Sequence, residues 1–283
     1  MYNPEEMLLK KQAAPEEELC PSEEEVYQDY VLSWKREGIK MDDFSDIYSE
    51  IKIKRDKNRV AEIKEEFRSS KTERSEILEA ILAGQIEQAN WFGENCSTVR
   101  ASEYDDLVNH TDLVAEFEEG GKSVRLALDV TTSQDKDTLA DKIDSIKKEI
   151  NRGRLTSLEY YLSEETEPPT KGRLEMVPRV IIGTDREGVK ELSDLVKKII
   201  RREKGSNLEL ANSQAQIEFL AEVKEQLEYF IDYAQGKKAA SSLINQQKMV
   251  LKIIERVLEN KKSSISPTNQ ARQNKTYQFL SSL

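Results

Sequence analysis

The most β-prone segment of the chain runs from Val124 to Thr132, where apolar side chains at every second position share one face of a predicted strand. Residues 112–117 contain few turn-forming residues, and residues 119–122 supply a glycine-rich reversal between the two runs. This pattern predicts a β-hairpin. Antiparallel pairing would then bring Asp112, where the first strand begins, close to Asp129, near the end of the second strand.

Apolar residues at helical spacing flank this hairpin on both sides. Thr72 or Ser75 is expected to cap a helix that runs to about Phe92, with Glu79 at the edge of its apolar stripe. Ser22 and Glu25 match a capping box at the start of an earlier helix. Other helices are expected over residues 3–14, 42–69, 135–151 and 188–202, and other strands over residues 97–101, 155–162 and 177–184, whereas residues 164–171 are expected to be a loop.

These elements predict an α/β fold, with a mixed four- to five-stranded sheet flanked by helices and with helical N-terminal and C-terminal extensions. The expected division is a helical N-terminal extension (1–71), an α/β core (72–205), a C-terminal helical hairpin (206–262) and a polar tail (263–283). The helical hairpin should break near residues 235–236. In the tail, Tyr277, Phe279 and Leu280 could either dock on a groove or remain mobile.

Charged residues are unevenly distributed along the chain. The net charge of −11 argues against a nucleic-acid partner, but residues 1–30 carry a net charge of −7 and residues 236–283 a net charge of +7. Local potential decides which partner approaches, so a nucleic acid remains compatible with the chain.

Two cysteines, Cys20 and Cys96, are too few for a disulfide framework or a cysteine-based zinc site. We expect reduced thiols in a cytoplasmic protein. No apolar run is long enough to cross a bilayer, and the N-terminus lacks the basic and apolar pattern of a signal peptide, so no membrane partner is expected. A homodimer is compatible with the sequence.

Two carboxylates on adjacent strands repel each other unless a proton or a cation lies between them. Hard cations such as Mg²⁺ or Mn²⁺ prefer oxygen ligands and retain waters, which leaves positions for a phosphate and an attacking water. Asp112 and Asp129 on the hairpin, with Glu79 from the preceding helix, therefore predict a divalent metal site.

Residues 72–185 resemble the core of the PD-(D/E)xK nuclease superfamily. In that family an acid on the first helix, an Asp at one hairpin strand and a D/E-x-K on the next strand share the metal. Carried over, Glu79 matches the helix acid, Asp112 the Asp of the PD element and Asp129-Val130-Thr131 the D/E-x-K, with the Val130 carbonyl as a further ligand. The resemblance implies a Mg²⁺-dependent endonuclease that hydrolyses phosphodiester bonds in DNA.

The sequence departs from the family at two positions: Thr131 replaces the lysine and Thr111 replaces the proline. Threonine carries no charge with which to orient or deprotonate the attacking water. Lys142 or Lys147, both on the following helix, are expected to replace the missing lysine, and Lys122 and Gln134 are alternatives. The predicted catalytic residues are Glu79, Asp112, Asp129, Thr131 and Lys147.

Without the motif lysine, the chain could instead be a catalytically inactive nuclease-fold module that binds nucleic acid or protein. A mainly helical scaffold with ordinary surface carboxylates is a further alternative. His110 is expected to be a loop residue, and Glu116 and Glu118 are expected to be solvated. The lysines and arginines of the C-terminal helices could track a phosphate backbone.

Overall fold

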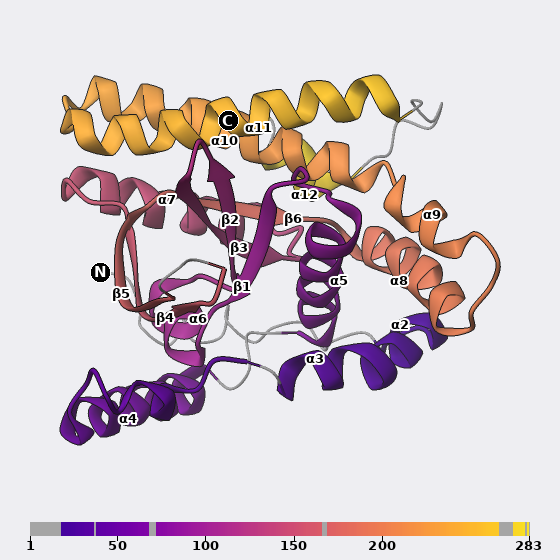
Figure 1. Ribbon diagram of the computed structural model, residues 1–283, viewed down its shortest axis with the longest axis horizontal. Helices are drawn as coiled ribbons and strands as arrows, with labels where there is room; N and C mark the ends of the chain where they lie inside the picture. Colours follow the sequence, from indigo (N-terminus) through magenta and orange to yellow (C-terminus); the bar gives the residue numbers. More distant parts are fainter. Residues whose placement is uncertain are drawn as a thin grey trace, which may run out of the picture.

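A four-stranded mixed sheet lies at the centre of the computed structural model, which describes residues 18–36, 38–67, 72–165, 169–265, 274–280 and 282 (Figure 1). Its strand order is β1 (Cys96–Arg100), β2 (Leu113–Glu119), β3 (Lys122–Thr131) and β6 (Arg179–Gly183). The first three strands are antiparallel neighbours, and β6 runs parallel to β3. A separate antiparallel pair is formed by β4 (Thr156–Ser163) and β5 (Thr170–Val177). The predicted α/β class with a mixed sheet is confirmed.

The predicted hairpin is β2 and β3. Gly120 and Gly121 take positive φ angles of 57° and 73° at the reversal, a conformation that glycine adopts without strain. Leu113 pairs with Leu128, which fixes the register. Alternate residues of β3 enter the largest apolar cluster. The helices that add side chains to this cluster include α5 (Glu73–Ala89), α8 (Arg186–Ile200), α10 (Ala215–Gly236) and α11 (Ser241–Ser264). The opposite face of β3 carries Asp129.

Three of the helices that the sequence predicts begin at side-chain caps. α5 (Glu73–Ala89) starts after Thr72, whose side chain accepts a hydrogen bond from the Ser75 amide at 3.2 Å. α7 (Lys136–Asn151) starts after Asp135, and α8 (Arg186–Ile200) starts after Asp185. Of the two predicted candidates, Thr72 and Ser75, Thr72 is therefore the cap of α5.

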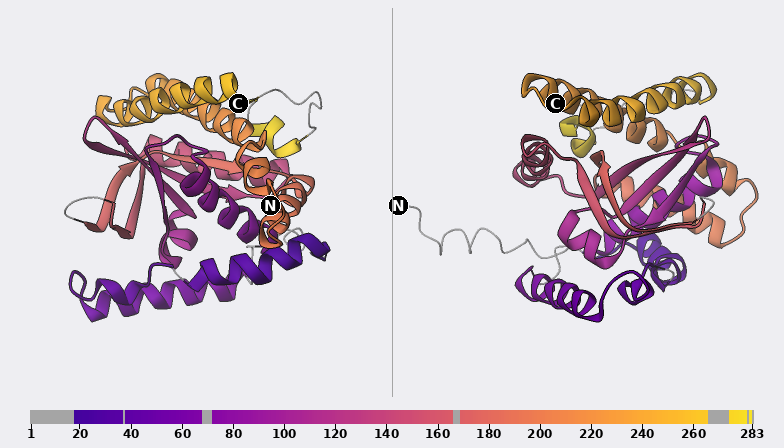
Figure 2. Two further views of the ribbon diagram at one scale, coloured as in Figure 1. Left: turned by 45° about the vertical axis from the view of Figure 1, so that its right-hand side comes forward. Right: turned by 60° about the vertical axis from the view of Figure 1, so that its left-hand side comes forward.

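Both views in Figure 2 show the N-terminal helices on the side of the molecule opposite α10 and α11. They are α2 (Pro21–Val26), the π-helical η1 (Tyr27–Val31), α3 (Leu32–Arg36), the 3₁₀ turn η2 (Met41–Phe44) and α4 (Glu50–Phe67). The predicted Ser22–Glu25 capping box is wrong: Cys20 is the cap, and its amide donates to the Glu23 carboxylate at 2.7 Å. Pro21 occupies the first helical position, which places the cap two residues before the predicted Ser22. The helix expected over residues 3–14 lies outside the described residues.

Two elements of the predicted α/β core (72–205) were not expected. α6 (Glu103–Asn109) lies within the polar stretch between β1 and β2, and it is capped by the Ser102 hydroxyl, which accepts from the Asp105 amide. β5 begins at Thr170, inside the predicted loop.

The C-terminal region contains α9 (Ser206–Ala211), α10 (Ala215–Gly236) and α11 (Ser241–Ser264), so the predicted break near residues 235–236 is confirmed. The short α12 (Lys275–Leu280) docks on the core through the fully buried Leu280. Two polar contacts fix it to the loops that follow β6 and β3: Asn274 donates to the Thr184 hydroxyl at 3.0 Å, and Thr276 donates to the Ser133 carbonyl at 2.9 Å. None of the helices in the described part of the chain combines the length and apolar character needed to cross a membrane.

Side chains of α10 cover the outer edge of β6. The Gln226 amide accepts from the Ile181 N–H at 2.8 Å and donates to the Ile181 carbonyl at 2.5 Å, as a neighbouring strand would. Glu222 accepts from the Gly183 N–H at 2.9 Å. This edge of the sheet therefore has its backbone groups satisfied without a further strand.

Glu222 is fully buried, and among the described residues its Oε1 atom has no hydrogen-bond partner. Burial raises the pKa of this carboxyl well above its ordinary value, against the lowering effect of the Gly183 N–H; the charge of Glu218 raises the pKa further. Because the pKa of Glu222 is higher in the folded state than in the unfolded state, this carboxyl costs no stability at pH values below its ordinary pKa. As pH rises from there toward the folded-state pKa, the free energy of unfolding decreases.

We therefore expect the Glu222→Gln variant to gain stability relative to the natural chain as pH rises from 5 to 8, by more than about 1 kcal/mol. Urea unfolding at the two pH values measures this difference. Glu225→Gln, at an exposed position of the same helix, serves as the control and should show no such gain. An equal response of both variants would contradict a buried, protonated Glu222.

Candidate functional site

Asp112 and Asp129 come together at one end of the hairpin, as the sequence predicts. Asp112 precedes β2, and its Oδ2 atom accepts a hydrogen bond at 2.7 Å from the amide of Val130, the residue after Asp129. The Asp112 amide in turn donates to the Leu128 carbonyl at 2.9 Å. Asp112 is 9 % exposed and Asp129 is 3 % exposed. The hairpin therefore holds two nearly buried carboxyl groups on adjacent strands.

Two cations neutralise Asp129. The Lys142 ammonium forms an ion pair with Oδ1, and Arg179 Nη1 lies 3.4 Å from Oδ2. Burial disfavours the charged form of Lys142, but the adjacent Asp129 carboxylate outweighs this cost, so the pKa of Lys142 is raised above its ordinary value. Lys142 therefore carries a positive charge at neutral pH.

Lys142, and not Lys147, is the lysine that reaches the hairpin acids. Five residues of helix rotate a side chain by about 140°, so the two lysines project from different faces of α7. The Lys147 ammonium lies 3.1 Å from Asp144 and 5.3 Å from the centre of the Tyr229 ring. Lys147, which belongs to the predicted catalytic set, therefore lies away from Asp129. Lys142 takes its place beside the Asp129 carboxylate.

Thr131 occupies the position of the motif lysine at the end of β3 and is 5 % exposed. Its hydroxyl accepts from the Ser133 amide at 3.2 Å, and its carbonyl accepts from the Thr184 amide at 3.3 Å. Gly183 packs so closely that a β-carbon there would lie 2.4 Å from the Thr131 carbonyl oxygen. Thr131 therefore helps to close the end of the β3–β6 pair, and it supplies no charge.

Glu79 is 2 % exposed on α5, a helix that packs against β3. Across the described ranges, no three or more His, Cys, Asp and Glu side chains form a group placed to hold a metal ion. The metal set of Glu79, Asp112, Asp129 and the Val130 carbonyl therefore stays a prediction. The part of it that the geometry brings together is the aspartate pair.

Sequence reasoning did not single out Arg179, which opens the apolar strand β6. Its guanidinium is almost fully buried and also reaches Glu149 and the Ser145 hydroxyl, each at 3.2 Å. A lone arginine before three buried apolar residues was the available signal, since a buried guanidinium requires a carboxylate partner. His110 takes a left-handed conformation after α6. Desolvation lowers the pKa of His110, and the charge of Arg179 lowers the pKa further.

The expectation that Glu116 is solvated is wrong, whereas Glu118 is exposed as expected. Glu116 is 4 % exposed and accepts from Arg125 Nε at 2.7 Å and from the hydroxyls of Tyr161 and Ser163. The reason is that β4, which the sequence did not place over this face, covers the middle of the hairpin.

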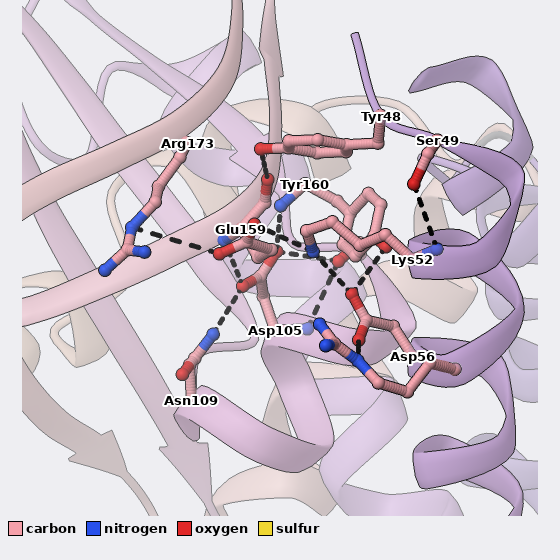
Figure 3. A network of polar contacts seen from close by, with 11 residues as sticks. Tyr48, Ser49, Lys52, Asp56, Asp105, Asn109, Glu159, Tyr160 and Arg173 are labelled. Carbon is pink, nitrogen blue, oxygen red and sulfur yellow. Dashed lines mark hydrogen bonds and ion pairs between the residues drawn. The ribbon is translucent and has the colours of Figure 1, made fainter. Parts of the chain in front are cut away.

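A second set of charged residues connects α4, α6 and β4 (Figure 3). The Asp105 carboxylate accepts from the amides of Glu159 and Tyr160 at 2.6 and 2.9 Å, and it also accepts from the side chains of Asn109 and Ser102. Lys52 forms ion pairs with both Asp56 and Glu159. These carboxylates are used by internal donors, which is typical of a structural connection and not of a site that awaits a ligand.

Comparisons with protein-family models, with curated proteins and with solved structures find no match to this chain.

Proposed function

We propose that this chain is a metal-dependent nuclease-like protein that hydrolyses phosphodiester bonds in DNA at Asp112, Asp129 and Lys142. The observation that carries the proposal is the ion pair of Lys142 with Asp129, opposite Asp112 on the adjacent strand. It supplies, from the following helix, the positive charge that Thr131 lacks. The resemblance of residues 72–185 to the PD-(D/E)xK superfamily supports the same assignment.

The two aspartates suit a Mg²⁺ or Mn²⁺ ion, because such ions are commonly held by one or two carboxylates together with waters and substrate phosphates. Asp112, Asp129 and the Val130 carbonyl would hold the ion, and Glu79 is the proposed further ligand. When bound, the ion would lower the pKa of a water and neutralise charge on the phosphate.

The protein's own groups provide the remaining chemistry. Since its raised pKa keeps Lys142 protonated, we assign it an electrostatic role: the ammonium holds a phosphate oxygen and stabilises the negative charge that develops there. Arg179 contacts Asp129 from the other side and orients its carboxylate. Thr131 and the two loops after β3 and β6 fix the end of the site. We also propose a cytoplasmic location, in keeping with the two free thiols.

The test incubates the purified chain with plasmid DNA and with branched DNA, in the presence of Mg²⁺, Mn²⁺ or EDTA. Hydrolysis that requires either ion supports the proposal. Asp112→Asn, purified in the same way, controls for a contaminating nuclease, because asparagine can still accept from the Val130 amide while it lacks the charge. Equal cutting by both proteins would refute the site, and no cutting under any condition would refute the activity.

A second candidate is a module that keeps the fold and binds nucleic acid or protein without cutting. The observation that favours it is that both oxygens of Asp129 already face cations, so its charge is balanced without a metal. For a nucleic-acid partner, this candidate predicts no cleavage with any divalent ion and a steep dependence of binding on salt concentration.

A further inference from the structure

We propose that a groove at the tip of the β2–β3 hairpin holds a nucleic-acid strand by its phosphates. The groove has a volume of about 890 Å³ and lies between the hairpin tip, the start of β5 and the helix α11. This inference rests on the proposed function, because it names where the substrate backbone is held.

The charges that line the groove are mainly positive. Lys122 and Arg125 come from β3, and Lys252 comes from α11. Neither lysine takes part in an ion pair within the described part of the chain. The acid of the lining, Glu119, is held in an ion pair by Arg256, with Nη1 2.9 Å from Oε1. The groove is therefore a local positive region on a chain whose net charge is −11.

Arg125 is fixed in an orientation that suits phosphate binding. Its Nε atom donates to Glu116 at 2.7 Å and to the Tyr161 hydroxyl at 3.0 Å, and its guanidinium lies over the Tyr161 ring. Both of the hydrogen bonds that the described residues give Arg125 leave from Nε, so the two Nη groups can face a ligand. A planar guanidinium with two such groups matches the oxygens of a phosphate.

A strand fits this groove better than a small anion does. The lining also includes Gln246 and Met249; Met249 is 44 % exposed and offers an apolar surface to a base. Arg125 and Asp129 lie on the same face of β3, four residues apart, which corresponds to about 13 Å along the strand. Arg125 is thus about 13 Å from the aspartate pair, across the part of the hairpin that β4 covers.

The test measures the binding of a fluorescein-labelled, 20-nucleotide single-stranded DNA by fluorescence anisotropy in EDTA, where no metal-dependent cleavage occurs. The double variant Lys122→Ala/Lys252→Ala should bind at least tenfold more weakly at low salt. The plot of log K against log salt concentration should also become less steep by about 1.4, the change expected for two phosphate contacts. Lys54→Ala/Lys190→Ala removes two exposed lysines elsewhere and should bind like the natural chain.

Affinity of the groove variant within twofold of the natural chain, or an equal loss in the control variant, would overturn the groove. Since binding is measured without a metal, the result does not depend on catalysis. If the natural chain binds the DNA but does not cleave it, the result counts against the proposed activity alone. If the groove variant loses cleavage but binds as tightly as the natural chain, the result counts against the groove alone.

Discussion

Lys142→Met is expected to lower the rate of DNA cleavage by about 10²–10³-fold, the usual cost of removing one charge-stabilising group from an active site. Methionine keeps most of the length of the lysine side chain but removes the ammonium that pairs with Asp129. Arg179 still faces Asp129 in this variant, so the carboxylate keeps a buried partner and the fold should persist. Initial rates on supercoiled plasmid at saturating Mn²⁺ measure the effect.

The matched control is Lys147→Met, which makes the same chemical change one and a half turns later on α7. Lys147 pairs with Asp144 and lies over Tyr229, so its loss should change the rate by no more than about twofold. Circular dichroism of both variants verifies the fold. Equal rates for the two variants would remove Lys142 from the mechanism and leave the motif lysine without a substitute.

Asp105→Ala should destabilise the protein by about 3 kcal/mol or more, although residue 105 lies outside the candidate site. The substitution leaves the amides of Glu159 and Tyr160 without their carboxylate acceptor in a nearly dry environment, since Asp105 is 1 % exposed. It also removes the hydrogen bonds that Asp105 accepts from Asn109 and Ser102 within α6 and its cap. Urea unfolding at pH 7 gives the free energy of unfolding.

Glu103→Ala, on the same helix, is the control. Its side chain is about half exposed and pairs with Lys64 across the surface, so the expected loss is below about 1 kcal/mol. If Asp105→Ala cost no more than this control, the Asp105 contacts in Figure 3 would not be what holds α6 against β4.

The hairpin could be predicted because its signals are local. Alternation at period two fixed which residues of β3 enter the core, and Gly120 and Gly121 marked the reversal. The convergence of Asp112 with Asp129 follows from the antiparallel register alone. These are the parts of the site that depend on the geometry of a single supersecondary unit.

The choice between Lys142 and Lys147 could not be made from the sequence, because it depends on the rotation of α7 about its axis. That rotation is set by Ile143, Ile146 and Ile150, which pack toward Ile181 and Phe230 on elements far along the chain. Arg179 was missed for a related reason: its carboxylate partners become visible only when β6 is placed beside β3.

The burial of Glu116 and the role of Asp105 were missed because both depend on β4, whose position over the hairpin no local pattern indicates. Asp105 and its amide donors are more than 50 residues apart in the sequence. α6 was not predicted because it is short and polar, and because its start depends on the Ser102 cap. Long-range placement, and not residue propensity, was the missing information.

The α10 side chains that cover β6 limit how two copies of this chain could associate. A strand from another molecule cannot extend the sheet beyond β6, since Gln226 and Glu222 already use the groups that it would need. At the other margin, β1, the Thr98 amide donates to Glu87, an exposed contact that water can replace. Growth of the sheet between molecules, whether in a dimer or in an aggregate, would therefore have to begin at β1 by displacing Glu87.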